Sequence, residues 1–245
     1  MKMLKLCLCH LYPELLNLYG DTGNILTLVK RCQWRGIDVN VINHNIGDKT
    51  DFKDVDIFFI GGGADGNLGI ACNDINSIKP QLEFAIEQDR VLLAICGGYQ
   101  LLGKYYKGKR DTVDGLGLLD FYTEAADKYF VGNIVVDTGD YYLVGFENHM
   151  GRTYLNGLSP LGHVISGFGN NGKDKTEGVR YKNVIGTYLH GPLLPKNPKL
   201  CDEIISIALK NKYNIEDLQE LDDSLEIKAR QHTLKSINNK FISFA

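Results

Sequence analysis

Residues Val91–Gly98 read VLLAICGG, an apolar run that ends in one cysteine and two glycines. The first five residues are typical of a β-strand that is buried on both faces, as the strands of parallel sheets are. The next five, Tyr99–Gly103, read YQLLG and are consistent with a helix. Cys96 therefore falls on a tight turn between a strand and a helix, where a side chain is pushed outward.

Short apolar segments alternate with helical patterns on the N-terminal side of this turn. We expect strands at 4–8, 37–41 and 55–60, and helices at 25–32 and 77–88. This alternation predicts an α/β fold, mainly a parallel sheet with helices on both faces. Beyond the turn, residues 113–190 are rich in strand-like segments, and residues 198–236 return to helical spacing. No linker, repeat or low-complexity segment interrupts the pattern, so we expect a single domain over residues 1–245.

Composition excludes several classes of protein. The net charge of −3 gives no electrostatic reason to expect nucleic acid or an anionic membrane as a partner. No apolar run approaches the roughly 20 residues that span a bilayer, and the start of the chain lacks the cleavage site of a signal peptide. The six cysteines show no spacing typical of disulfides or of a metal site. We expect a cytoplasmic protein with reduced thiols.

The position of Cys96 is typical of a nucleophile. Reactive groups in parallel sheets lie at the carboxyl ends of strands, and a helix N-terminus there stabilises a thiolate. Ala94 stands where a strict elbow motif has glycine, but alanine is still small. The alternative is that Cys96 is a small buried hydrophobe, which is our reading of the other five cysteines. The glycines at 97 and 98 favour the nucleophile.

Attack by a thiolate on an amide or ester creates an oxyanion, which needs N–H donors that are already in place. The amide of Gly97 is one candidate, and the loop Gly61–Gly63 after the preceding strand offers another, near Gly62 and Gly63. A phosphate-binding loop is the alternative for three successive glycines. The lysine and the glycine spacing of such loops are absent here.

Among six histidines, His190 is the best candidate for a base. It follows the apolar strand 184–189 and precedes Gly191, so it should reach the same edge of the sheet as Cys96. His149 lies in residues 145–153, which we read as a polar loop suited to substrate recognition.

Six stretches of the chain, in order, resemble the class I (triad) glutamine amidotransferases of the cobyric acid synthase-like, or CobB/CobQ-like, branch. They are LNLYGDTGNI (16–25), FFIGGG (58–63), ICGGYQ (95–100), GLGLLDFYT (115–123), GFENH (145–149) and GTYLHGPLLPKNP (186–198). The resemblance implies a flavodoxin-like glutaminase domain with Cys96 as nucleophile and His190 as general base and acid.

The chain departs from this family's pattern at three places. Common members carry a glutamate two residues after the histidine, where this chain has Pro192. The resemblance implies Asp21 as the substitute, and a second reading makes Asp21 the N-cap of the following helix. The residues after Gly63 differ from the usual Asp-Arg-Glu-Gln pattern, and Tyr129 stands where an arginine is expected to help bind substrate. Our candidates for binding substrate are Gly62, Gly63, Gly97, Gln100, Tyr129, Asn148 and His149.

Within this branch the chain looks most like the glutaminase subunits of lipid II isoglutaminyl synthases. That likeness implies L-glutamine as substrate and a heterodimer with a Mur-ligase-like subunit, MurT. The chain would contact lipid II only through this partner. It implies no cofactor or metal here, with ATP and Mg²⁺ on the partner. The alternatives are a glutaminase of cobyrinate or cobyrate amidation, a cysteine hydrolase of the DJ-1 type, and a degenerate scaffold subunit.

Overall fold

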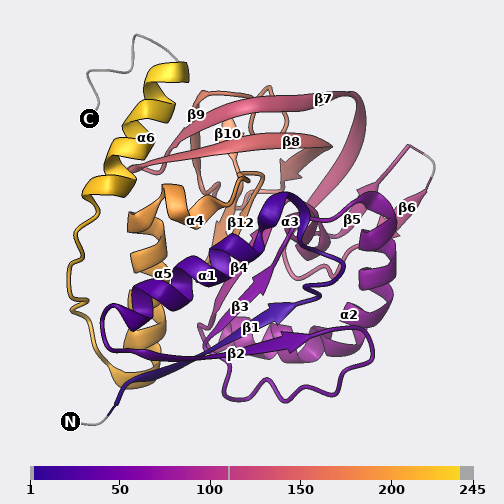
Figure 1. The fold of residues 1–245 in the computed structure, drawn as a ribbon. Coiled ribbons are helices and arrows are strands. Elements are labelled where there is room, and N and C mark those ends of the chain that lie inside the picture. The colour runs from indigo at the N-terminus through magenta and orange to yellow at the C-terminus, as the bar shows by residue number, and fades with distance from the viewer. Residues whose placement is uncertain (1–2, 110, 238–245) are drawn as a thin grey trace.

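Six strands form the central sheet of the computed structural model, which describes residues 3–109 and 111–237 (Figure 1). The spatial order is β11-β12-β4-β3-β1-β2, and every neighbouring pair is parallel except β11 with β12. The strands are β1 (Lys5–Leu11), β2 (Asp38–His44), β3 (Ile57–Ile60), β4 (Val91–Ile95), β11 (Val179–Tyr181) and β12 (Val184–Thr187). Because β3, β4 and β12 are buried at every position, their sequences are apolar rather than alternating.

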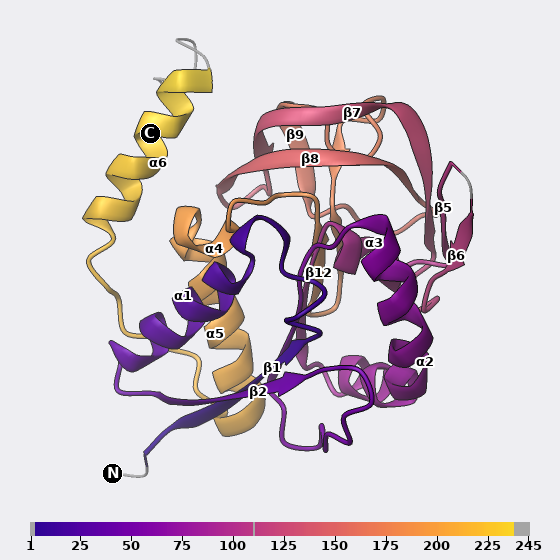
Figure 2. The same cartoon turned by 45° about the vertical axis from the view of Figure 1, so that its right-hand side comes forward.

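Helices cover both faces of this sheet (Figure 2). One face carries α1 (Thr22–Gln33) and α5 (Pro198–Tyr213), and the other carries α2 (Asp65–Glu87) and α3 (Gly97–Leu102). The short helices η1 (Leu18–Gly20) and α4 (Leu193–Lys196) lie in connections, and α6 (Ser224–Ile237) ends the described chain. The expected mainly parallel sheet with helices on both faces is confirmed.

A second sheet follows α3, and the sequence patterns did not reveal it as a separate sheet. Its order is β10-β9-β7-β5-β6. The strand β8 lies outside this order and pairs with β7. Its strands are β5 (Tyr105–Lys107), β6 (Thr112–Asp114), β7 (Phe121–Asp137), β8 (Tyr142–Leu155), β9 (Gly162–Ser166) and β10 (Thr176–Glu177). The long β7–β8 hairpin arches over the end of the central sheet where β12 finishes (Figures 1 and 2). An antiparallel bridge between Phe146 and His190 joins the two layers there.

Several element boundaries in the structure differ from the expected ones. The helix expected at 77–88 begins earlier, at Asp65, because a buried stripe that includes Leu68, Ala71 and Ile75 outweighs the weak helix formers around it. The strand expected at 184–189 ends at Thr187. The helical region expected at 198–236 is two helices, since Asn214 takes a left-handed conformation and stops α5.

Glu177 is a fully buried carboxyl group that connects the two sheets. Its Oε1 accepts hydrogen bonds from the Thr187 hydroxyl and the Tyr188 amide, each 2.7 Å long, while its Oε2 has no hydrogen-bond partner among the described residues. Burial raises the pKa of Glu177 to about 7, against the lowering effect of these hydrogen bonds, and the charge of Glu147 adds to the rise. Ionisation of Glu177 therefore costs the folded state free energy.

This pKa predicts how stability depends on pH. Since the folded-state pKa lies above the unfolded value, the contribution of Glu177 is complete below pH 4.5 and is lost as the pH rises through about 7. E177Q keeps the acceptor oxygen and removes the titration. We expect the variant to gain about 2 kcal/mol of unfolding free energy relative to wild type between pH 5 and pH 8, measured by urea denaturation. Stability curves that stay parallel over this range would contradict the assignment.

Candidate active site

Cys96 occupies a strained turn between β4 and α3. Its backbone has φ 49° and ψ −102°, a left-handed conformation that non-glycine residues rarely adopt. The Cys96 amide donates a 2.8 Å hydrogen bond to the carbonyl of Thr187, which fixes the turn to the end of β12. The side chain is only 7% exposed and borders a cavity. The structure thus has the elbow that the sequence predicts.

The two glycines after Cys96 are required by packing. A Cβ atom on Gly97 would lie 2.6 Å from Leu68 Cδ2, and one on Gly98 would lie 2.7 Å from the carbonyl oxygen of Ile60. These close approaches let the start of α3 lie directly against the loop that follows β3. The elbow strand and the triglycine loop are therefore neighbours, as the strand order requires.

His190 follows β12 and is buried completely. Its backbone exchanges two hydrogen bonds with Phe146 of β8, of 2.8 and 3.2 Å. No hydrogen bond of ordinary geometry from the described residues reaches either ring nitrogen. Burial alone would lower the pKa of His190, but the negative charges of Cys96 and Asp21 raise it to about 10. The site therefore favours the imidazolium form of His190.

Asp21 lies beside His190 and is also buried completely. Its Oδ2 accepts a 2.7 Å hydrogen bond from the Gly62 amide, and its Oδ1 lies 3.7 Å from His190 Nδ1. The carboxylate makes no capping hydrogen bond to α1. Asn17 does this instead, because its Oδ1 accepts from the Thr22 amide at 2.8 Å. Asp21 is thus the N-cap residue of α1 by position, but its carboxylate does not cap the helix and faces the histidine instead.

Pro192, at the position of the family's usual glutamate, packs against Gly23. A Cβ atom on Gly23 would collide with the Pro192 ring. The Leu194 amide also donates a 2.8 Å hydrogen bond to Asn24 Oδ1. These contacts hold the first turn of α1 against the segment after His190, which brings Asp21 within reach of the imidazole.

Gly62 occupies the space between the three side chains. A Cβ atom there would lie 2.9 Å from His190 Cε1, 3.3 Å from Asp21 Oδ2 and 3.4 Å from Cys96 Cβ. Because the Gly62 amide donates to Asp21, it is not available to an oxyanion, contrary to our expectation. The Gly63 nitrogen lies 3.0 Å from the ideal Cβ position of Gly97. The amides of Gly63 and Gly97 remain the candidate donors.

A cavity of about 340 Å³ opens beside Cys96 and contains most of the expected substrate-binding side chains. Its lining includes Gly63, Gln100, Tyr129, Asn148 and His149, but not Gly62 or Gly97. Tyr129 is 59% exposed. It lies in the irregular part of β7, between the ladder positions of Ala125 and Phe130.

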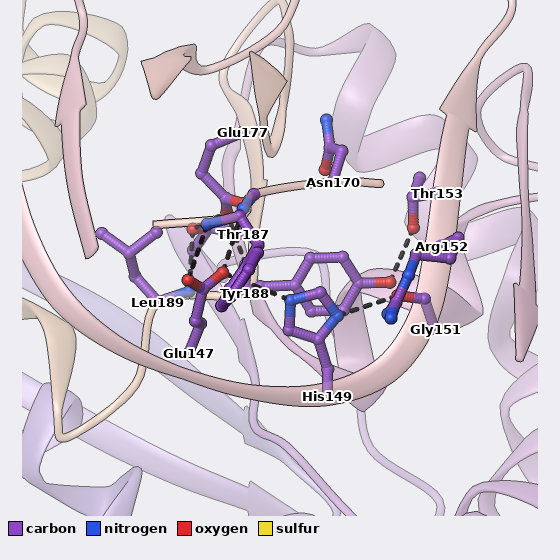
Figure 3. Close-up of polar contacts among 12 residues, drawn as sticks. Glu147, His149, Gly151, Arg152, Thr153, Asn170, Glu177, Thr187, Tyr188 and Leu189 are labelled. Carbon is purple, nitrogen blue, oxygen red and sulfur yellow. Dashed lines mark hydrogen bonds and ion pairs between the residues drawn. The ribbon is translucent and has the colours of Figure 1, made fainter. Parts of the chain in front are cut away.

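His149 lies within β8 (Figure 3). Our expectation that it lies in a polar loop was therefore wrong. Its ring stacks on Tyr188 with centroids 3.6 Å apart, and its Nδ1 lies 2.9 Å from the Gly151 carbonyl oxygen. Its Nε2 lies 3.6 Å from Glu147 Oε2. Burial lowers the pKa of His149, although Glu147 opposes this effect, so the ring contributes to the cavity as a neutral group.

Sequence reasoning missed several residues that shape the site. Tyr188 accepts a 3.2 Å hydrogen bond from Gln100 Nε2 and lies 2.6 Å from the Thr153 hydroxyl. Glu147 accepts from two backbone amides near Phe168, of 2.8 and 3.0 Å. Tyr19 borders the cavity. Each belongs to a stretch that carries the family resemblance, but only its position in space indicates a role.

The fold and the arrangement of the site are those of a class I glutamine amidotransferase, and comparison with known proteins agrees. A family profile described as a CobB/CobQ-like glutamine amidotransferase domain matches residues 8–198. The chain belongs to this family. A solved glutamine amidotransferase structure superimposes with a TM-score of 0.56 at 17% identity, covering 82% of this chain and 98% of that one, which supports the fold alone.

Two curated relatives match nearly the whole length of the chain. It is 44% identical to the lipid II isoglutaminyl synthase (glutamine-hydrolysing) subunit GatD of Staphylococcus aureus strain N315, over 97% of this chain and 98% of that protein. It is 43% identical to subunit GatD of Streptococcus pneumoniae strain R6, over 88% and 84% respectively. A probable cobyric acid synthase of Methanococcus maripaludis strain C5 is 38% identical over 47% of this chain but only 26% of that protein.

The crowding around Gly62 predicts the effect of a single methyl group. G62A would push His190 away from Cys96 and Asp21, since the new Cβ would lie too close to the imidazole. We expect glutamine hydrolysis to fall by at least about tenfold, because general acid–base catalysis depends on hydrogen-bond reach. G66A is the matched control, since nothing lies within 4 Å of a Cβ there. Equal activity of the two variants would contradict this geometry.

Proposed function

We propose that this chain is a glutaminase subunit that hydrolyses L-glutamine to glutamate and ammonia and delivers the ammonia to a partner. The observation that carries the proposal is the convergence of Cys96, His190 and Asp21 around Gly62, beside the 340 Å³ cavity. The identity of 44% to a glutamine-hydrolysing subunit over almost the whole of both chains supports it.

In the first half of the proposed reaction, the Cys96 thiolate attacks the side-chain amide carbon of glutamine. A carbon–sulfur bond forms, and the oxyanion is held by the amides of Gly63 and Gly97. His190, as imidazolium, protonates the amide nitrogen, and the carbon–nitrogen bond breaks to release ammonia. The raised pKa of His190 suits this role, since the proton is present at neutral pH.

In the second half, the now neutral His190 takes a proton from water, which attacks the glutamyl thioester. The tetrahedral intermediate collapses, glutamate leaves and the Cys96 thiolate is restored beside an imidazolium. Asp21 would orient the ring and stabilise its positive charge through both half-reactions, as the acid of a catalytic triad does. Gln100, Tyr129, Asn148 and His149 would bind the rest of the glutamine molecule.

The acceptor side of the reaction belongs to a partner in this proposal. The GatD relatives are named as subunits of lipid II isoglutaminyl synthase, so we propose a Mur-ligase-like partner, MurT, in a heterodimer. That partner would bind ATP and Mg²⁺, activate the α-carboxylate of the D-glutamate in lipid II and receive the ammonia. The complex would work in the cytoplasm. Among the described residues, no helix is long and apolar enough to cross a membrane.

Replacement of the nucleophile tests the glutaminase claim. We expect C96A and C96S both to abolish glutamate release, because neither alanine nor a serine hydroxyl replaces a thiolate paired with His190. C201A is the control, since Cys201 is buried in α5 and burial raises the pKa of its thiol. The assay is run with and without a Mur-ligase-like partner. Absence of release in every condition, despite a stable complex, would point to a scaffold subunit instead.

A second variant tests Asp21 as the third member of the triad. D21N keeps an oxygen to accept the Gly62 hydrogen bond but removes the negative charge that raises the pKa of His190. We expect kcat to fall by about 10- to 100-fold and the alkaline limb of its pH profile to move to lower pH. An unchanged pH profile would assign Asp21 a purely structural role.

A further inference from the structure

Tyr19 is held in an unfavourable backbone conformation beside the catalytic histidine. Its φ of 57° and ψ of 24° lie in the left-handed region, which is costly for a bulky residue. Its ring meets the His190 imidazole edge to face, with centroids 5.0 Å apart and an interplanar angle of 71°. Strain of this kind persists where contacts with the surrounding structure enforce it.

Asn148 supplies the main contact. Its Nδ2 donates a hydrogen bond to the Tyr19 hydroxyl. Tyr19 comes from the segment before α1, whereas Asn148 comes from β8 of the second sheet, and both line the cavity beside Cys96. The bond therefore joins the two layers across the cavity. The Leu18 amide secures the other side of the segment by donating a 2.9 Å hydrogen bond to the Gly62 carbonyl.

The position of the His190 ring depends on these packing contacts. Neither ring nitrogen has a hydrogen bond of ordinary geometry to a described residue, and Asp21 Oδ1 is 3.7 Å from Nδ1. Gly62 leaves no room for a Cβ atom beside Cε1, and the Tyr19 ring packs against the imidazole. A charge at 3.7 Å attracts the imidazole but fixes its angle only weakly, whereas an aromatic edge restricts rotation by steric contact.

We propose that Tyr19 is a positioning residue for His190, and that the hydrogen bond from Asn148 latches Tyr19 in place over the glutamine cavity. This inference rests on the proposed glutaminase function and deepens it. It also changes the role of Asn148, which acts through Tyr19 in addition to bordering the cavity. With the latch closed, His190 is shielded from bulk water and directed toward Cys96 during proton transfer.

A double-mutant cycle tests the latch. Y19F keeps the ring and removes the hydroxyl, N148A removes the donor, and the double variant removes both. Loss of one neutral hydrogen bond corresponds to a fall in kcat of about three- to tenfold, and we expect each single variant to show it. The kcat of the double variant should lie within about twofold of the kcat of either single variant, because all three variants lack the same hydrogen bond. For Y19F, KM should change less than kcat, since the latch acts on the proton donor.

Alkylation of Cys96 by iodoacetamide gives a readout that a merely structural role would not move. This reagent is about the size of a side-chain amide, and mass spectrometry locates the product. Burial raises the pKa of the other five thiols, so they should react slowly. Because the latch lies over the cavity beside Cys96, its loss should admit the reagent more readily. We expect Y19F and N148A to speed the labelling of Cys96 to the same extent, with no further gain in the double variant. Y122F is the control, since Tyr122 stacks between Tyr105 and Tyr154, outside the cavity lining.

The outcomes separate this inference from the proposed function. If wild type and variants release no glutamate, the glutaminase proposal fails, while the labelling cycle still decides whether the latch exists. If wild type is active but the two single effects add in the double variant, Tyr19 and Asn148 act independently and the latch is overturned. An effect on KM alone would also overturn it, because Tyr19 would then be part of the wall that binds glutamine.

Discussion

The hydrogen bond from the Gly62 amide to the buried carboxylate of Asp21 is the contact on which the site depends. Burial of a carboxylate is costly unless hydrogen bonds and opposite charge compensate for it. Here one oxygen has the amide of the triglycine loop, and the other faces the imidazole of His190, whose pKa is raised. The bond therefore ties the loop after β3 to the start of α1. The bond also places Gly62 at the centre of the site, where there is no room for a Cβ atom.

The rest of the arrangement follows from the geometry of parallel strands. β3, β4 and β12 are adjacent and end at the same edge, so the triglycine loop, the cysteine turn and His190 meet there without long connections. The second sheet closes this edge by pairing β8 with the backbone of His190. Pro192 and Gly23 then pack together, which brings Asp21 of the N-terminal segment close to His190.

Much of this could be predicted from the sequence, and the omissions have physical causes. Apolar strands followed by Cys96 and His190 reveal the fold and the two reactive groups, because strand ends dictate where those side chains lie. The direction of the Asp21 carboxylate is not encoded locally, since Asn17 rather than Asp21 accepts the hydrogen bond from the first amide of α1. Likewise, His149 was assigned to a loop because polar residues line the cavity along β8 and disguise the strand. Tyr19 became informative only when its contacts with His190 and Asn148 were known.

The central claim is that Cys96 and His190 form a nucleophile and proton donor that cleave the side-chain amide of glutamine. The most direct measurement is acid quenching of the protein during turnover with isotopically labelled glutamine, followed by mass spectrometry of its peptides. The account predicts one labelled glutamyl group in thioester linkage on the peptide that contains Cys96. Glutamate production with no covalent label on Cys96 at any quench time, in reactions fast enough to detect the thioester, would contradict it.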